Sequence, residues 1–174
     1  MPIYHIYALT SNLLTFAHLG IENVLITNPR DLSAFVRELA RHSFSFLSGV
    51  NTLFDGLLAT PAFDSLDFRS LQICLGGGTA VKADTALRWQ RTPGVAIAQG
   101  YGLTEASPMV TGNPMDSTEL TGSIGLPLPS TEVAIIDDAD RELGFDETGE
   151  ICVRGPQVMP GISWPSCQRR VSAR

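Results

Sequence analysis

The N-terminal part of the chain alternates between short apolar runs and longer segments with helical spacing, and this alternation limits the possible folds most. Runs with the length and composition of buried strands occur at 24–26, 44–50, 71–75 and 95–98. Apolar residues with helical spacing occur at 3–19, 31–41, 52–59 and 79–91. Because strands that alternate with helices usually pair in parallel, the pattern predicts an α/β fold with a mostly parallel sheet and covering helices.

The pattern changes near residue 115. Glycine and proline become frequent, and strand-like runs at 133–136 and 150–153 are separated by turn residues. These features predict part of a small antiparallel, β-barrel-like subdomain.

The changes in pattern divide the chain into three parts. We expect an incomplete α/β subdomain over 1–115 and the start of the β-rich subdomain over 116–161. The stretch 162–174 is rich in arginine and has no periodicity, so it is expected to be an aberrant, disordered tail. A reading-frame shift near Gly161 is one hypothesis for its origin.

Composition excludes several classes of protein. Hydrophobic residues make up 44% and charged residues 17%, which is typical of a globular domain. The net charge of −6 and the single lysine, Lys82, argue against binding to nucleic acid. The sequence has no apolar stretch long enough to span a membrane, and its three cysteines lack zinc-site spacing. A cytoplasmic location is therefore expected.

The most informative motif is residues 99–106, Gln-Gly-Tyr-Gly-Leu-Thr-Glu-Ala, which follows a predicted strand. Its glycines would let a ligand approach the backbone closely. The Thr104 hydroxyl could bond a phosphate, and the Glu105 carboxylate could hold Mg²⁺. The alternative is a strand-to-helix turn, in which Thr104 caps a helix and Glu105 is an acidic first-turn residue.

A second glycine-rich segment, Gly76-Gly77-Gly78-Thr79, also lies between a predicted strand and a predicted helix. A flat ring or a phosphate could rest against such bare backbone, and a tight turn is the alternative. Val81 occupies the place of the third glycine of a dinucleotide-binding fingerprint, and no phosphate loop of the GxxxxGK[ST] type is present. A self-contained Rossmann-type binding module is therefore disfavoured.

Five segments, taken in order, resemble the adenylate-forming (AMP-binding) enzymes and, among these, the bacterial long-chain fatty acid–CoA ligases. The segments are 1–6, 76–78, 100–105, 122–127 and 149–159. The first is similar to the family's substrate-side motif, in which a proline and an apolar residue precede a Tyr-His pair. Five ordered matches are far more specific than any single one of them.

The resemblance implies roles for particular residues. The adenine pocket would be lined by Gly77, Gly78, Gly100, Tyr101 and Gly102. Thr104 would bond the α-phosphate, and Glu105 would hold Mg²⁺. His5 would lie near the path of the acyl group and the phosphates.

The resemblance also implies a reaction and its partners. Such enzymes convert a fatty acid, ATP and CoA into acyl-CoA, AMP and diphosphate through an acyl-adenylate. ATP or AMP, Mg²⁺ and CoA would be the ligands, and any contact with the inner face of the membrane would be peripheral, because the fatty acid substrate partitions into lipid.

Three parts of the family pattern are not found in this chain. The phosphate loop with its lysine is expected before the Tyr-His pair, the ribose-binding Tyr-x-Thr-Gly-Asp segment after Met159, and a C-terminal domain with a catalytic lysine beyond that. We therefore expect a fragment of such a ligase that is inactive alone. The alternative is a non-catalytic remnant that binds at most a ligand or a partner.

Overall fold

The computed structural model describes residues 1–117, 121–164 and 167–169. Its helices are α1 (Ile6–Ala8), the π-helix η1 (Leu9–Leu14), α2 (Thr15–His18), α3 (Leu32–Leu39), α4 (Asn51–Leu58), the 3₁₀ helix η2 (Phe63–Ser65), α5 (Ala83–Arg91) and the 3₁₀ helix η3 (Thr104–Ala106). Its strands are β1 (Phe46–Gly49), β2 (Ile73–Gly76), β3 (Ile97–Gly102), β4 (Met109–Gly112), β5 (Leu126–Pro127), β6 (Glu132–Ile136), β7 (Glu150–Arg154), β8 (Ile162–Trp164) and β9 (Cys167–Arg169).

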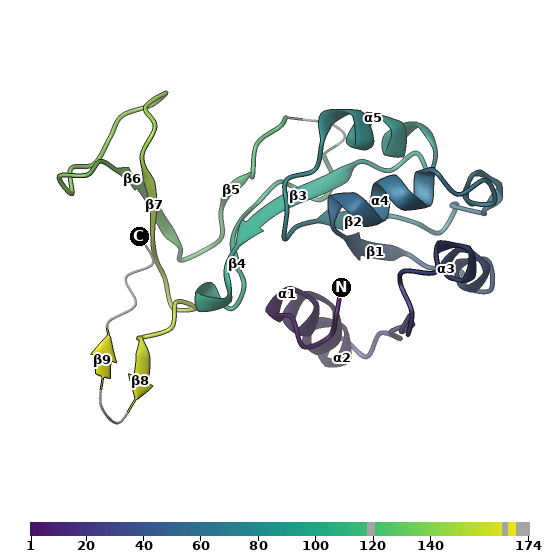
Figure 1. Cartoon of the computed structure of the whole chain (residues 1–174), viewed down its shortest axis with the longest axis horizontal. Coiled ribbons are helices and arrows are strands. Elements are labelled where there is room, and N and C mark those ends of the chain that lie inside the picture. Colours follow the sequence, from purple (N-terminus) through teal and green to yellow (C-terminus); the bar gives the residue numbers. More distant parts are fainter. Residues whose placement is uncertain (118–120, 165–166, 170–174) are drawn as a thin grey trace.

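The main sheet has five strands in the order β1-β2-β3-β4-β5. β1, β2 and β3 pair in parallel, whereas β4 and β5 are antiparallel additions on the far side of β3. The predicted α/β fold is thus confirmed, with a mixed sheet that is parallel in its first three strands. Strands β6 and β7 pair antiparallel and lie to one side, beyond β5 (Figure 1). The described residues form no closed barrel.

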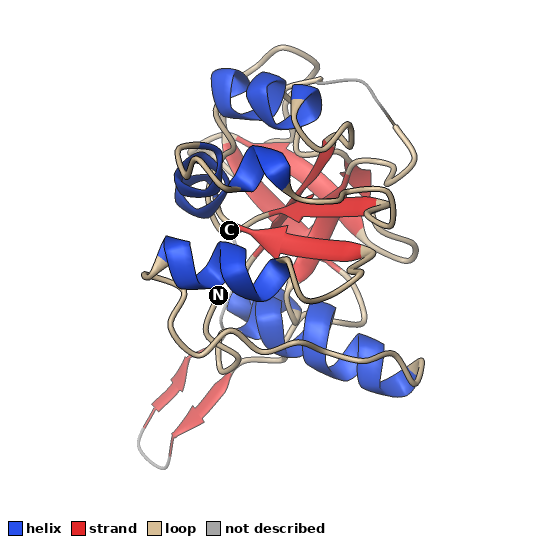
Figure 2. Cartoon of the chain, turned by 90° about the vertical axis from the view of Figure 1, so that its right-hand side faces the viewer, coloured by secondary structure: helices blue, strands red, loops and turns tan. Residues whose placement is uncertain are grey.

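Helices cover both faces of the parallel strands. α4 and α5 lie on one face and the continuous helical segment from α1 to α2 lies on the other (Figures 1 and 2). Successive side chains of a strand point to opposite faces. Cys74 and Ile97 therefore join the cluster beneath α4 and α5, whereas Leu75 and Ala98 face the N-terminal helical segment.

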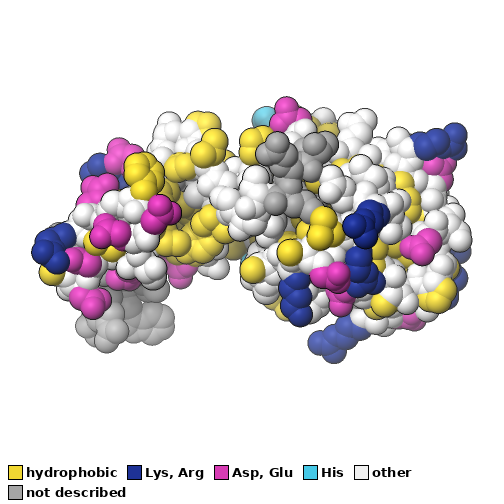
Figure 3. Space-filling view, turned by 90° about the horizontal axis from the view of Figure 1, so that it is seen from above, with side chains coloured by type: hydrophobic (Ala, Val, Ile, Leu, Met, Phe, Trp, Pro, Cys, Tyr) yellow, Lys and Arg dark blue, Asp and Glu magenta, His cyan; other side chains and the backbone are white. Residues whose placement is uncertain are grey.

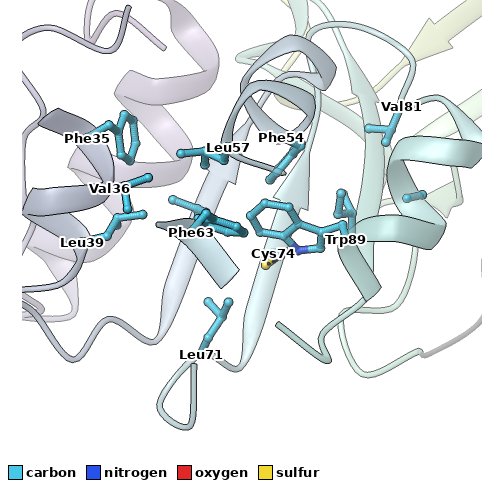
Figure 4. Packing of buried hydrophobic residues seen from close by; sticks show 13 residues of the cluster. Phe35, Val36, Leu39, Phe54, Leu57, Phe63, Leu71, Cys74, Val81 and Trp89 are labelled. Carbon is cyan, nitrogen blue, oxygen red and sulfur yellow. Dashed lines mark hydrogen bonds between the residues drawn. The ribbon is translucent and has the colours of Figure 1, made fainter. Parts of the chain in front are cut away.

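An aromatic cluster fills the core beneath α4 and α5 (Figure 4). The Trp89 ring is fully buried between Phe54 and Phe63, with centroid distances of 4.7 and 5.3 Å. Its indole N–H donates to Cys74 Sγ at 3.3 Å. Burial raises the pKa of the Cys74 thiol to about 12, so this cysteine is an inert core residue.

Three predicted elements differ from the observed ones. Residues 24–26, predicted as a strand, pair with no other segment of the described chain, and β1 is an edge strand whose only neighbour there is β2. The helix predicted from residue 79 begins at Ala83, because the backbone at its N-cap, Lys82, is extended (φ −67°, ψ 141°). The strand predicted over 95–98 runs from Ile97 to Gly102, because β4 extends its pairing.

In the stretch predicted to be a disordered tail, β8 and β9 form an antiparallel pair. Residues 165–166 and 170–174 of that stretch lie outside the described residues. The division of the chain at residues 115 and 161 stays a prediction.

The distribution of charge and the length of the helices bear on the expectations about nucleic acid and membranes. On the face shown in Figure 3, Lys and Arg side chains are scattered among acidic ones rather than gathered into one patch. In the part of the chain that the structure describes, no helix has the length and apolar character that crossing a membrane requires.

Candidate functional site

One cavity of about 160 Å³ lies between the start of the N-terminal helical segment, the loop after β2 and the end of β3. Its lining includes seven of the eight predicted site residues: His5, Gly77, Gly78, Gly100, Tyr101, Gly102 and Thr104. The eighth, Glu105, follows in the same turn but is not part of the lining. The cavity thus brings together three segments that are far apart in the sequence.

The loop after β2 presents bare backbone to the cavity, because a side chain is disfavoured at both Gly77 and Gly78. The Gly77 N–H donates to the carbonyl oxygen of Gly49 at 3.2 Å, which continues the parallel pairing past β2. A Cβ at Gly77 would lie 3.2 Å from the Tyr7 ring. Gly78 has φ +77°, which a residue with a side chain rarely adopts. Glycine is therefore required in this loop for two separate reasons.

Two side-chain amides hold the far end of this loop. Gln99 Oε1 accepts from the Val81 N–H at 3.1 Å, and Asn51 Oδ1 accepts from the Lys82 N–H at 2.8 Å. Asn51 is buried, so its bond is shielded from water. The loop is thereby fixed to β3 on one side and to α4 on the other.

The Tyr-Gly segment, which the sequence placed after a predicted strand, lies within strand β3. The register shifts between Tyr101 and Gly102 because the antiparallel strand β4 joins there. A Cβ at Gly102 would lie 2.8 Å from the carbonyl carbon of Pro108, closer than atoms pack. The Leu103 N–H donates to that same carbonyl at 2.8 Å. A glycine at position 102 therefore allows the chain to close a tight turn.

This tight turn contains Thr104 and Glu105. We call it the Thr104 turn and define it as residues 103–108. Its carbonyls at Leu103 and Thr104 accept from Ala106 N–H at 3.0 Å and Ser107 N–H at 3.3 Å. The alternative in which Thr104 caps a helix is wrong, since only the three-residue η3 follows and Leu103 holds the cap position. The exposed Thr104 side chain lines the cavity instead.

His5 lines the cavity from the N-cap position of α1. Its Nδ1 accepts from the Tyr7 N–H at 3.2 Å, which caps the helix. That bond fixes the ring, and in the neutral form it leaves the proton on Nε2.

The sequence reasoning missed Tyr7, whose hydroxyl donates to the Leu75 carbonyl at 2.8 Å. Burial raises the pKa of Tyr7, so the phenol keeps its proton and acts as a donor. Its ring forms the wall behind Gly77. The only signal in the sequence was its position two residues after His5.

Comparison with known proteins gives the family. The family model described as "AMP-binding enzyme" matches residues 1–163. The long-chain-fatty-acid–CoA ligase of Salmonella typhimurium is 52% identical over 161 residues, which cover 92% of this chain and 29% of that protein. The chain thus spans less than a third of the length of this relative.

Solved structures show the same fold. An anthranilate–CoA ligase in complex with anthranoyl-AMP has a TM-score of 0.85 at 23% identity, over 91% of this chain and 31% of that one. ATP-bound MatB from Rhodopseudomonas palustris has a TM-score of 0.78 at 27% identity, over 92% of this chain and 31% of that one. With the family model matching nearly all of its residues, the chain belongs to the AMP-binding enzyme family.

Proposed function

We propose that this chain supplies the adenylate-binding segment of a long-chain fatty acid–CoA ligase. One observation carries the proposal: three separated segments with the family's motifs line a single cavity, in a chain 52% identical to such a ligase. The reaction would use a fatty acid, ATP and CoA. The carboxylate attacks the α-phosphorus and diphosphate leaves; the CoA thiol then attacks the acyl carbon and AMP leaves.

Each part of the cavity suits one part of an acyl-adenylate. The bare backbone at Gly77, Gly78 and Gly100 would let a flat adenine lie close, with the Tyr101 ring beside it. The exposed Thr104 hydroxyl would donate to the α-phosphate. His5 would approach the acyl and phosphate groups.

A magnesium ion fits this segment only together with the nucleotide. No three His, Cys, Asp or Glu side chains gather into a metal site among the described residues, so the proposed ligand from this segment is a single carboxylate, that of Glu105. Mg²⁺ commonly binds through one or two carboxylates and keeps phosphate and water oxygens as its other ligands. Bound there, the ion would neutralise phosphate charge. The chain's share is to hold Glu105 in place through the turn.

No Lys or Arg lies among the described residues that line the cavity. Neutralising the phosphates of ATP typically contributes several kcal/mol to phosphoryl and adenylyl transfer. We therefore expect the 174-residue chain alone to bind nucleotide weakly and to turn over negligibly. The competing proposal, a non-catalytic binding remnant, predicts no activity in any context. A cytoplasmic location and peripheral contact with the membrane stay predictions.

Nucleotide titration of the ¹⁵N-labelled chain tests the proposed site. Adding AMP, and then Mg²⁺ with ATP, should shift the amide signals of Gly77, Gly78 and residues 100–104 most, and leave those of β6 and β7 unchanged. Thr104→Val should weaken AMP binding, because the phosphate loses a donor, whereas the exposed control Thr148→Val should not. Shifts confined to other parts of the chain would contradict the proposal.

A further inference from the structure

The segment Gly155–Met159 belongs to a motif that the proposed function leaves unused, yet it contacts the Thr104 turn directly. The Met159 N–H donates to the carbonyl oxygen of Glu105 at 2.8 Å. This bond joins the segment that follows β7 to Glu105, the residue proposed to hold Mg²⁺. The backbone at Glu105 is therefore held from outside the turn as well as from within it.

Gln157 makes the second connection. Its side-chain Nε2 donates to the Met109 carbonyl at 3.3 Å and to Thr131 Oγ1 at 2.8 Å. Met109 is the first residue of β4, directly after the Thr104 turn, and Thr131 immediately precedes β6. One half-buried amide thus links the exit of the turn to the β-rich part of the chain.

The local backbone is shaped around this amide. Gly155 has no side chain, and a Cβ there would lie 3.2 Å from Gln157 Cδ and overlap its Oε1. The Val158 N–H donates back to the Gly155 carbonyl at 3.2 Å and closes a turn around Pro156 and Gln157. The Gln157 side chain is consequently directed at Met109 and Thr131.

We propose that Gln157 is a positioning residue, which fixes the Thr104 turn from the β-rich side so that Thr104 and Glu105 face the nucleotide phosphates. The identity of the ligand in this proposal rests on the proposed function. The restraint on the turn is independent of that function. A restraint far from the reacting atoms matters because small misplacements of phosphate-binding groups are costly.

Amide hydrogen exchange of the full chain without nucleotide tests the restraint itself. Gln157→Met removes both donated bonds at nearly the same volume, so the amides of Leu103, Ala106 and Met159 should exchange roughly three- to tenfold faster, the effect expected for the loss of one or two hydrogen bonds. Amides of α5 should keep their protection, and the exposed control Gln72→Met should change nothing.

A second pair of variants distinguishes loss of this restraint from a general loss of stability. Thr131→Val removes the acceptor and should reproduce the faster exchange, whereas Thr131→Ser keeps the hydroxyl and should restore protection. The same variants are then titrated with Mg²⁺ and ATP. Gln157→Met, which removes both bonds, should weaken ATP binding most, Thr131→Val, which removes one, should weaken it less, and Thr131→Ser should not weaken it.

The two readouts separate the two proposals. Unchanged exchange in both Gln157→Met and Thr131→Val would overturn the positioning role. Faster exchange in a chain whose unaltered form fails to bind ATP would support the restraint and contradict the nucleotide site.

Discussion

Gly102→Ala is expected to weaken nucleotide binding about a hundredfold while leaving the rest of the chain folded. The new Cβ would meet the Pro108 carbonyl and lie 3.0 Å from Met109 Cα, and both are backbone atoms that cannot rotate away. The Thr104 turn would have to open, which would displace the Thr104 hydroxyl. A misplacement of about 1 Å can cost about a hundredfold in activity, so we expect a loss of that order in AMP affinity.

The matched control is Gly144→Ala. At that position the only atom near a new Cβ is the flexible carboxylate end of Glu147, 3.3 Å away. AMP affinity is measured by the same amide titration for both variants, with circular dichroism as the check on folding. If Gly102→Ala binds AMP as well as the unaltered chain, the turn does not form part of the site.

Trp89→Ala is expected to destabilise the chain by about 3–5 kcal/mol, the usual cost of truncating a fully buried large aromatic residue. The indole fills the space between Phe54 and Phe63, and the loss would also leave Cys74 Sγ without its donor. Because domains of this size are stable by roughly 5–15 kcal/mol, the variant should be close to unfolding.

Urea denaturation followed by circular dichroism measures this effect. Leu87→Ala on the same helix is the control: its side chain is 45% exposed, so the expected loss is within about 0.5 kcal/mol. A loss below about 1 kcal/mol for Trp89→Ala would show that the aromatic cluster does not hold the α/β part together.

Elements whose stability is local could be predicted from the sequence. Asp31 is the N-cap of α3 and its carboxylate accepts from the Ala34 N–H at 2.9 Å, while Phe35, Val36 and Leu39 face the core. The parallel strands β1 and β2 were visible as apolar runs. Helical spacing and capping depend on residues that are close in the sequence, so these elements could be predicted without knowing their distant partners.

Features that depend on distant partners were not predictable. Residues 24–26 have the composition of a strand, but Val24 and Leu25 are exposed and no neighbouring strand pairs with them. The predicted strand ended at residue 98 because glycines are poor strand formers, yet pairing with β4 extends it through the Tyr-Gly segment.

The candidate site likewise has residues that could be predicted from the sequence and residues that could not. Its glycines could be predicted because close backbone approach and positive φ both favour glycine over other residues. Tyr7 and Gln157 could not, because their partners lie 68 and 48 residues away along the chain. Nothing in the residues around them indicates those contacts.

If this chain is the adenylate-binding segment of a long-chain fatty acid–CoA ligase, it should replace the corresponding segment of a relative. The most direct test replaces the aligned 161 residues of the Salmonella typhimurium ligase with those of this chain and measures acyl-CoA formation from a long-chain fatty acid, ATP and CoA. We expect the chimera to form acyl-CoA and the isolated chain to form none. A chimera that folds and binds CoA but forms no acyl-CoA would contradict the claim.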